Sequence, residues 1–143
     1  MNTPRTTRRR GVVGVVWRDE QFLVIRRSQF VAAPGAYCFP GGGMEAGESE
    51  AEALAREIQE ELGVAAILGP RLWASQTPWG VDLVWMQIEL PAGVPLQLDP
   101  REVESYQWLG AEALYSHPEL LASNRDFLDA WKQQVFHLDW RPA

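Results

Sequence analysis

Residues 40–64, PGGGMEAGESEAEALAREIQEELGV, decide the fold of this chain because they join a glycine-rich turn to an acidic helix. Seven of the chain's 19 acidic residues lie between Glu45 and Glu61. Crowded carboxylates repel one another and work against a compact fold unless a cation lies among them. The stretch therefore predicts a metal-binding turn and helix, around which the rest of the chain is arranged.

The helix has a clear beginning and end in the sequence. Ser49 and Glu52 form a capping box, which predicts Ser49 as the N-cap of the helix. Gly63 supplies the C-terminal stop. Between these ends, apolar residues recur at helical spacing and form an apolar stripe: Ala51, Leu54, Ala55, Ile58 and Leu62.

Three glutamates share one edge of this helix. At about 100° per residue, Glu57, Glu60 and Glu61 fall within roughly a third of the helix circumference, beside the apolar stripe. Carboxylate oxygens at this spacing suit Mg²⁺ or Mn²⁺, and the turn at residues 40–43 allows the backbone to approach the same space. Arg56 can hold a neighbouring carboxylate by bidentate hydrogen bonds. Taken alone, an acidic helix face is usually a solvated surface, so the combination with the turn favours a metal site.

The flanking sequence predicts a mixed α/β layered domain. A helical turn is expected at Ala111–Tyr115 and a C-terminal helix at Glu119–Val135. No internal repeat or second-domain boundary is visible, so residues 11–143 are expected to form a single domain. Strands are predicted at Gly11–Arg18, Phe22–Arg27, Ala36–Phe39, Ala65–Ser75, Val81–Leu90 and Val103–Leu109.

The charge distribution separates residues 1–10 from the rest of the chain. These residues carry four Arg and no acid, and they are expected to be a flexible Arg-rich N-terminus. The net charge of the chain is −6, so without those four Arg the remainder carries −10, which argues against stable nucleic-acid binding. No apolar run approaches the roughly 20 residues of a membrane span. The single cysteine, Cys38, is interpreted as a small buried hydrophobe, and a cytoplasmic protein is expected.

The spacing within the acidic stretch resembles the Nudix box. Counting from Gly42, five residues lead to Glu48, and seven more lead to Arg56, which is followed by EIQEELGV. This is similar to Gly-x5-Glu-x7-Arg-Glu-U-x-Glu-Glu-x-Gly-U, where U is aliphatic, and every defined position matches. The resemblance is specific over residues 42–64 and less so over the flanking strands. It implies a Nudix-type α/β/α sandwich with a mixed central sheet.

The resemblance also implies a reaction and a set of site residues. Nudix hydrolases use Mg²⁺ or Mn²⁺ to cleave a pyrophosphate bond in a nucleoside diphosphate linked to another moiety. Many of them take a further carboxylate from a downstream loop, which Glu102 matches best and Glu104 second. The implied metal ligands are the Gly41 carbonyl, Glu57, Glu60 and Glu61, with Glu57 also a candidate base, while Arg56, Glu48 and Gly42 would support the ligands.

The residues that would select the substrate are less clearly marked. Seven Trp in a chain of 143 residues supply flat stacking surfaces. The candidate stacking groups are Trp17, Tyr37, Trp73, Trp79 and Trp85, although each of them is more simply explained as core. The substrate class stays open among nucleoside triphosphates, nucleotide sugars and similar small molecules, and a homodimer stays open as well. The candidates for substrate contact are Arg26, Arg27, Tyr37, Trp79, Asn124 and Arg125.

Two other functions are compatible with the same fold. One is a Nudix-fold sensor that binds a nucleotide-type ligand without hydrolysis, in which an Arg-rich arm would matter. The other is a diphosphate isomerase, in which Cys38 would act as an acid–base group. Both alternatives usually carry an altered box, so the intact box favours hydrolysis.

Overall fold

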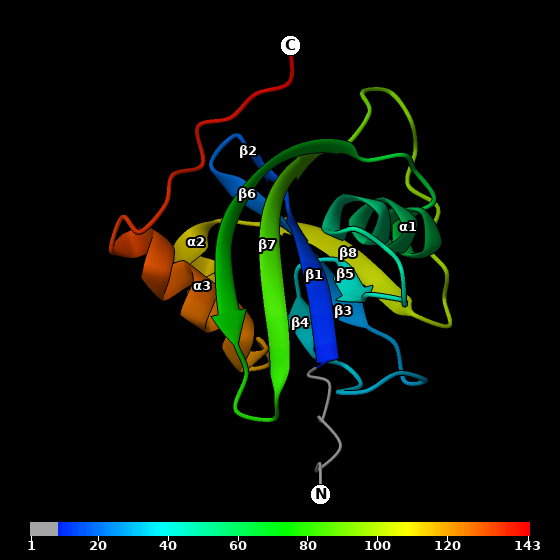
Figure 1. Cartoon of the computed structure of the whole chain (residues 1–143), viewed down its shortest axis with the longest axis horizontal. Helices are drawn as coiled ribbons and strands as arrows, with labels where there is room; N and C mark the ends of the chain where they lie inside the picture. Colours follow the sequence, from blue (N-terminus) through cyan, green and yellow to red (C-terminus); the bar gives the residue numbers. More distant parts are fainter. Residues whose placement is uncertain (1–8) are drawn as a thin grey trace, which may run out of the picture.

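The computed structural model of the chain describes residues 9–143 (Figure 1). Residues 1–8, which hold most of the predicted flexible N-terminus, lie outside the described residues. Arg9 and Arg10 belong to the first strand, β1 (Arg9–Val15), which therefore begins two residues before the predicted start.

Four strands form a mixed sheet in the order β5-β1-β7-β6. β1 runs parallel to β7 (Val81–Glu89), and β7 pairs antiparallel with β6 (Ile67–Gln76). On its other edge, β1 pairs antiparallel with β5 (Gly41–Gly43). The predicted mixed sheet is confirmed, and β1 and β7 form its centre (Figure 1).

A second, antiparallel sheet is formed around β3 (Gln21–Arg27). β3 pairs with β2 (Trp17–Arg18), β4 (Tyr37–Cys38) and β8 (Val103–Leu109). The single strand predicted over residues 11–18 is wrong in one respect, because the chain leaves β1 at Val16 and enters the second sheet at β2. The Val16 carbonyl accepts a hydrogen bond from the Leu23 amide of β3 at 3.1 Å, so the chain already contacts the second sheet at Val16.

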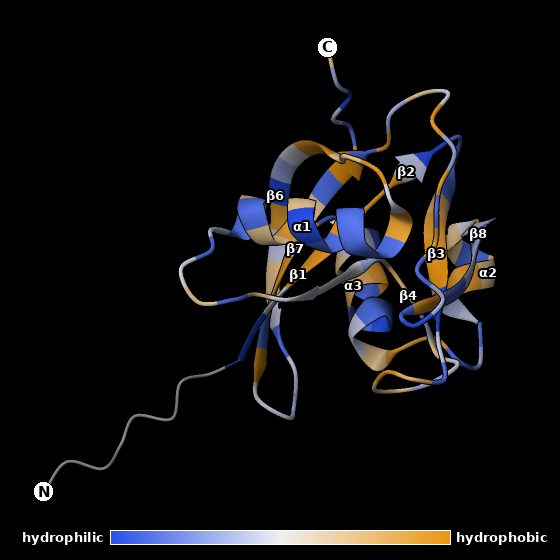
Figure 2. Cartoon of the chain, turned by 90° about the vertical axis from the view of Figure 1, so that its right-hand side faces the viewer, coloured by the Kyte–Doolittle hydropathy of each residue, from blue (hydrophilic) through white to orange (hydrophobic). Residues whose placement is uncertain are grey.

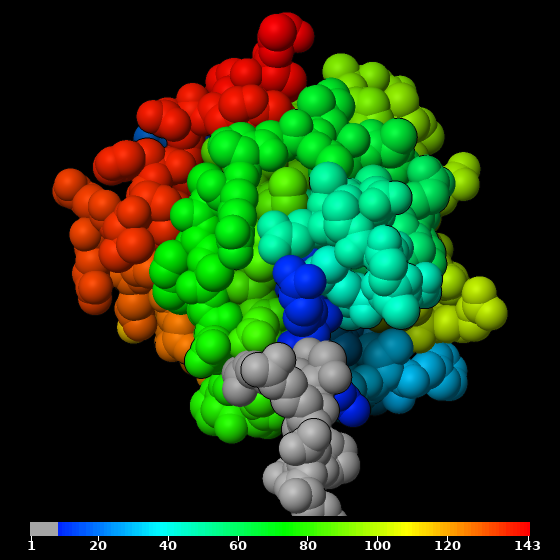
Figure 3. All heavy atoms as spheres, viewed as in Figure 1, coloured from blue at the N-terminus to red at the C-terminus, as the bar shows by residue number. Residues whose placement is uncertain are grey.

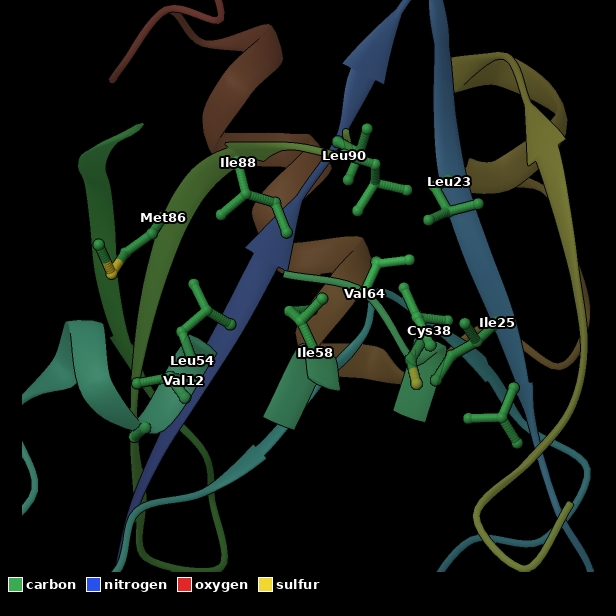
Figure 4. Close-up of a cluster of buried hydrophobic side chains, with 14 of the residues drawn as sticks. Val12, Leu23, Ile25, Cys38, Leu54, Ile58, Val64, Met86, Ile88 and Leu90 are labelled. Atoms are coloured by element: carbon green, nitrogen blue, oxygen red, sulfur yellow. The ribbon is translucent and has the colours of Figure 1, made fainter. Parts of the chain in front are cut away.

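The helices lie on opposite sides of the sheets. α1 (Glu50–Leu62) covers one side, and α2 (Ala111–Tyr115) and α3 (Ala122–Lys132) cover the other (Figures 1 and 2). Strand side chains alternate between the two buried clusters, so Val84 and Met86 pack on the α1 side while Trp85 packs on the α3 side. Figure 4 shows the α1-side cluster, in which Leu54 and Ile58 of the helix lie among Val12, Met86 and Ile88 of the strands.

The predicted helix caps are confirmed. The Ser49 hydroxyl accepts a hydrogen bond from the Glu52 amide at 3.1 Å, and the Glu52 carboxylate accepts one from the Ser49 amide at 3.0 Å. Gly63 ends α1 in the left-handed conformation, with a φ of 69°. These two ends fix which residues of α1 face the sheet.

Two predicted elements are wrong. Residues 41–43 are a strand rather than a turn, because they continue the ladder of β1. The C-terminal helix begins at Ala122 rather than Glu119, and it ends at Lys132 rather than Val135. The later start of this helix is explained by Tyr37. The Tyr37 amide donates to the Glu119 carbonyl at 2.9 Å, and the Tyr37 carbonyl accepts a hydrogen bond from the Leu121 amide at 3.0 Å. This isolated bridge with Tyr37 keeps residues 119–121 out of the helix, although the helical pattern of the sequence continues through them.

Within residues 9–143, no helix combines the length and the apolar character needed to cross a membrane.

Candidate active site

A cavity of about 220 Å³, here called the acidic cavity, lies beside the C-terminal half of α1. Three carboxylates from two distant parts of the chain face it, together with the glycine strand β5 and one arginine. Its lining residues are Arg27, Val31, Gly41, Gly42, Gly43, Glu57, Glu61 and Glu102.

Glu61 is the most deeply buried of these carboxylates. Its side chain lies in the last turn of α1, and the residue is only 5% exposed. The Gly41 amide donates to Glu61 Oε1 at 2.9 Å. Burial is the main cause that raises the pKa of Glu61 to about 8; the charges of Glu57 and Glu102 act in the same direction, against the hydrogen bond from the Gly41 amide and the charge of Arg27. Without a cation, this group therefore holds a proton near neutral pH.

Glu57 occupies a space that only glycine leaves open. A Cβ atom built on Gly42 would overlap the Glu57 carboxylate, so the absence of a side chain at Gly42 makes room for this group against β5. Arg56 Nη1 donates to Glu57 Oε1 at 2.9 Å. Burial raises the pKa of Glu57 in spite of this hydrogen bond. The glutamate is therefore more basic than an exposed carboxylate.

Glu102 reaches the acidic cavity from the turn before β8. Its Oε2 atom is buried and has no hydrogen-bond partner within the described part of the chain. Burial raises its pKa, and the charges of Glu60 and Asp99 add to this effect. Glu104, the second candidate for this role, does not line the cavity and instead lies 3.5 Å from Arg26. The structure thus brings Glu102, and not Glu104, to the box glutamates.

Arg56 holds the loop between β5 and α1 in place. Its Nε and Nη2 atoms donate to the two oxygens of Glu48 at 2.7 and 2.8 Å, and Nη2 also donates to the Gly43 carbonyl at 2.9 Å. The bidentate pair, with a further hydrogen bond from the Glu45 amide, lowers the pKa of Glu48 to about 2. Glu60 lies outside the acidic cavity, 45% exposed, with its carboxylate 3.3 Å from Arg56 Nη1.

The donor set of the acidic cavity fits a hard divalent cation. The charge of Glu102 raises the pKa of both Glu57 and Glu61, and the buried Oε2 atom of Glu102 has no hydrogen-bond partner in the described part of the chain. No group of three or more His, Cys, Asp or Glu side chains among residues 9–143 is already drawn together as a metal site. The Glu57 and Glu60 carboxylates are both hydrogen bonded to Arg56, so cation binding requires them to exchange these hydrogen bonds for the metal.

A larger cavity of about 490 Å³, here called the apolar cavity, adjoins the acidic cavity. The two share Arg27 and Gly41–Gly43, so Arg27 lies where they meet. The apolar cavity is lined by Val13, Leu83 and Leu121, with Trp79 at the β6–β7 turn. Figure 3 shows the start of β1 (blue) exposed between the β6–β7 region (green) and the box segment (cyan).

The other substrate candidates hold structural positions. Asn124 lines the apolar cavity but is buried, and its Oδ1 accepts a hydrogen bond from the Phe39 amide at 2.9 Å. Arg125 donates to the carbonyls of Tyr115 and His117 at 3.0 and 2.9 Å. The remaining two candidates, Arg26 and Tyr37, lie outside both cavities. Arg26 lies against the Gly35 carbonyl and Glu104, and the Tyr37 ring packs on His117. Trp17, Trp73 and Trp85 pack in the α3-side cluster, which agrees with their interpretation as core, whereas the same interpretation is wrong for Trp79, which is 66% exposed.

Cys38 is a buried hydrophobe, as predicted. It is a free thiol, and burial raises its pKa to about 11. A thiol with this pKa is protonated at neutral pH, which does not suit the acid–base role that an isomerase would require.

Two features of the site had no clear signal in the sequence. Val31, which lines the acidic cavity, comes from the loop between β3 and β4, where nothing in the local pattern marks it. Ser28 is buried at the start of the same loop, and its amide donates to the Glu102 carbonyl at 3.0 Å. Ser28 depends on contacts with Arg101 and Glu102, which lie more than 70 positions away in the sequence. Val31 lines the cavity together with residues of the box.

Comparison with known proteins agrees with this geometry. The sequence model of the NUDIX domain matches residues 7–131. The chain belongs to the Nudix family. The resemblance drawn from the box is thereby confirmed.

Relatives of this Nudix chain include proteins with different named substrates. It is 33% identical over 108 residues to the NAD-capped RNA hydrolase NudC of Stutzerimonas stutzeri (strain A1501), covering 75% of this chain and 38% of that protein. The chain thus spans about two fifths of the length of the NudC proteins it matches. It is 26% identical over 107 residues to the CTP pyrophosphohydrolase of Escherichia coli (strain K12), covering 75% of this chain and 79% of that protein.

The fold is shared with solved structures. The crystal structure of MutT protein from Methanosarcina mazei Go1 matches with a TM-score of 0.74 at 22% identity, covering 93% of this chain and 99% of that chain. This match confirms the predicted Nudix-type α/β fold.

Proposed function

We propose that this chain is a divalent-metal-dependent Nudix hydrolase that cleaves a pyrophosphate bond in a nucleoside diphosphate linked to another moiety. The observation that supports this most directly is the unpartnered, buried oxygen of Glu102, a residue that lines the same small cavity as Glu57 and Glu61. A buried carboxylate whose charge no partner neutralises destabilises the folded protein, and a bound cation would remove this cost. The named activities of the NudC and CTP pyrophosphohydrolase relatives are consistent with hydrolysis.

Each box residue has a role in this proposal. Glu57, Glu60, Glu61 and the Gly41 carbonyl would hold Mg²⁺ or Mn²⁺, which supplies neutralisation of phosphate oxygens and a lowered pKa of bound water. Gly41 already lies against Glu61 through its amide. Arg56 fixes the position of the loop before α1 through Glu48 and the Gly43 carbonyl.

Two carboxylates are candidates to accept the proton of the attacking water. Both Glu57 and Glu102 line the acidic cavity, and burial raises the pKa of each. A raised pKa brings a carboxylate closer to the value at which a general base is effective near neutral pH. A base of this kind contributes about 10²- to 10⁴-fold in rate.

The nucleoside part of the substrate would occupy the apolar cavity. Its volume of about 490 Å³ lies in the range of small-molecule sites. Trp79 offers an exposed aromatic face, and Arg27 lies between this cavity and the acidic cavity, where it would contact a phosphate oxygen. The phosphate chain would thus run from Arg27 toward Glu57 and Glu61.

A hydrolysis screen tests the proposal. The substrates are nucleoside triphosphates, nucleotide sugars, dinucleoside polyphosphates and ADP-ribose, each with Mg²⁺, with Mn²⁺ and with a chelator. At least one compound is expected to release phosphate-containing products only with the metal, and Glu57→Gln and Glu61→Gln are expected to abolish the release. Unchanged turnover in both variants would refute the assignment. Tight binding of a nucleotide without any turnover would instead support a Nudix-fold sensor.

A further inference from the structure

An open groove of about 640 Å³ adjoins the acidic cavity at Glu102. It is lined by Phe30, Val31, Asp99, Arg101 and Glu102, and we refer to it as the Phe30 groove. Val31 and Glu102 also line the acidic cavity, so the two spaces adjoin at these two residues. The Phe30 groove shares no lining residue with the apolar cavity. The acidic cavity therefore lies between two separate spaces.

Each of these two spaces carries an exposed aromatic side chain. Within residues 9–143, the aromatic side chains with large exposed surface are Phe30 at 81%, Trp79 at 66% and Tyr106 at 43%. Trp79 lines the apolar cavity and Phe30 lines the Phe30 groove, whereas Tyr106 lines neither. An exposed aromatic ring beside a charged site is suited to stacking against a flat group of a ligand.

The wall that carries Phe30 is tied to the wall that carries Glu102. The Phe30 amide donates to the Ser28 hydroxyl at 3.2 Å, and this hydroxyl donates to the Arg101 carbonyl at 2.6 Å. The Ser28 amide donates to the Glu102 carbonyl at 3.0 Å. Because Ser28 is only 2% exposed, these hydrogen bonds are shielded from water and hold the two walls at a fixed spacing.

The opposite wall offers a second flat group. The Arg101 guanidinium is exposed, and its Nε and Nη2 atoms donate to the Asp99 carboxylate at 3.2 Å each. Asp99 therefore orients the guanidinium and balances its charge. A guanidinium plane held in this way can stack on a nucleobase or contact a phosphate.

We propose that the Phe30 groove is a second substrate subsite, which receives an aromatic ring on the far side of the pyrophosphate from the nucleoside bound in the apolar cavity. The proposal rests on the proposed hydrolase function. It identifies the preferred substrate class as a pyrophosphate that carries a ring-bearing group at both ends, as a dinucleotide does. A nucleoside triphosphate leaves the Phe30 groove empty and gains nothing from Phe30.

Two compounds with the same pyrophosphate isolate the contribution of the second ring. P1,P2-di(adenosine-5′) diphosphate has a nucleoside at both ends, and the methyl ester of ADP replaces one nucleoside with a methyl group. In the wild type, kcat/KM with Mg²⁺ is expected to be roughly tenfold higher for the dinucleotide, mainly through KM, as stacking of one base provides. Phe30→Ala is expected to bring the ratio close to one. Phe30→Tyr keeps the ring and is expected to retain the ratio, and Tyr106→Ala is the control outside the groove.

The same ratio of kcat/KM values can also overturn the proposal. An unchanged ratio in Phe30→Ala would overturn it, as would a fall of the same factor for both compounds, because Phe30 would then act on the loop rather than on the second ring. Calorimetric Kd values for the two compounds with the same variants measure the ratio without hydrolysis. Complete absence of metal-dependent turnover with a retained Kd ratio would refute the hydrolase function and support the subsite.

Discussion

The buried carboxyl of Glu61 predicts that the metal-free protein loses stability as the pH rises. Burial raises its pKa from 4.5 to about 8. A group whose folded pKa is raised contributes its stability fully below the unfolded pKa, and this contribution is lost as the pH rises through the folded pKa. The loss from Glu61 therefore occurs between about pH 4.5 and about pH 8. Glu61→Gln removes the ionisation and keeps an oxygen to accept the hydrogen bond from the Gly41 amide.

The magnitude follows from the width of this pH window. One unit of pKa shift corresponds to about 1.4 kcal/mol, so at pH 7.5 the ionisation of Glu61 in the unfolded chain lowers the free energy of unfolding by at most about 4 kcal/mol. We expect Glu61→Gln to raise the free energy of unfolding of the metal-free protein by about 2–4 kcal/mol at pH 7.5. Near pH 4.5 the same substitution is expected to change the stability by less than about 1 kcal/mol.

Urea unfolding followed by tryptophan fluorescence, in EDTA at both pH values, measures these differences. Glu60→Gln is the matched control, because it makes the same chemical change on the same helix at a residue outside the acidic cavity. The reasoning is refuted if Glu61→Gln is no more stable than the wild type at pH 7.5. It is refuted equally if the gain is the same size at pH 4.5, because a packing effect would not depend on the ionisation of Glu61.

Three further substitutions test the geometry of the site. Gly42→Ala is expected to displace the carboxylate packed against it and to lower kcat by about 100-fold, measured by steady-state kinetics, with the circular dichroism spectrum retained. Glu102→Gln is expected to lower kcat by about 10²- to 10⁴-fold, whereas Glu104→Gln, which lies outside the acidic cavity, is expected to change it by less than about twofold. Arg56→Lys loses the bidentate hydrogen bonds to Glu48 and is expected to weaken Mg²⁺ affinity by about 10- to 100-fold, measured by calorimetry. Wild-type Mg²⁺ affinity in Arg56→Lys would show that the loop before α1 keeps its position without the guanidinium.

The box and its helix could be predicted because their determinants are local. Ser49, Glu52 and Gly63 mark the ends of α1 through hydrogen bonds that span only a few residues. With the ends fixed, the helical repeat places Glu57 and Glu61 on the edge that faces the cavity. No long-range contact is needed for either inference.

The errors lie where distant segments decide the local structure. Tyr37, more than 80 positions away in the sequence, bonds to residues 119–121 and keeps them out of the helix, although the helical pattern continues through them. The selection of Glu102 depends on β3, because the register of β3 and β8 shifts between Arg26 and Arg27, where Arg27 pairs with Val103. This bulge leaves Glu104 on the side of Arg26 and brings Glu102 to the acidic cavity.

The acidic side chains crowded around α1 differ in the partners that they have within the protein. Glu52 belongs to the capping box, Glu48 pairs with Arg56, and Glu50 lies 3.2 Å from Arg10. Each of these carboxylates meets a cation or a backbone donor in the metal-free chain. Glu57 and Glu61 differ, because burial raises the pKa of both despite the hydrogen bonds that they accept. Among these box acids, Glu57 and Glu61 therefore gain most from an external cation, whereas Glu48, Glu50 and Glu52 already have partners within the protein.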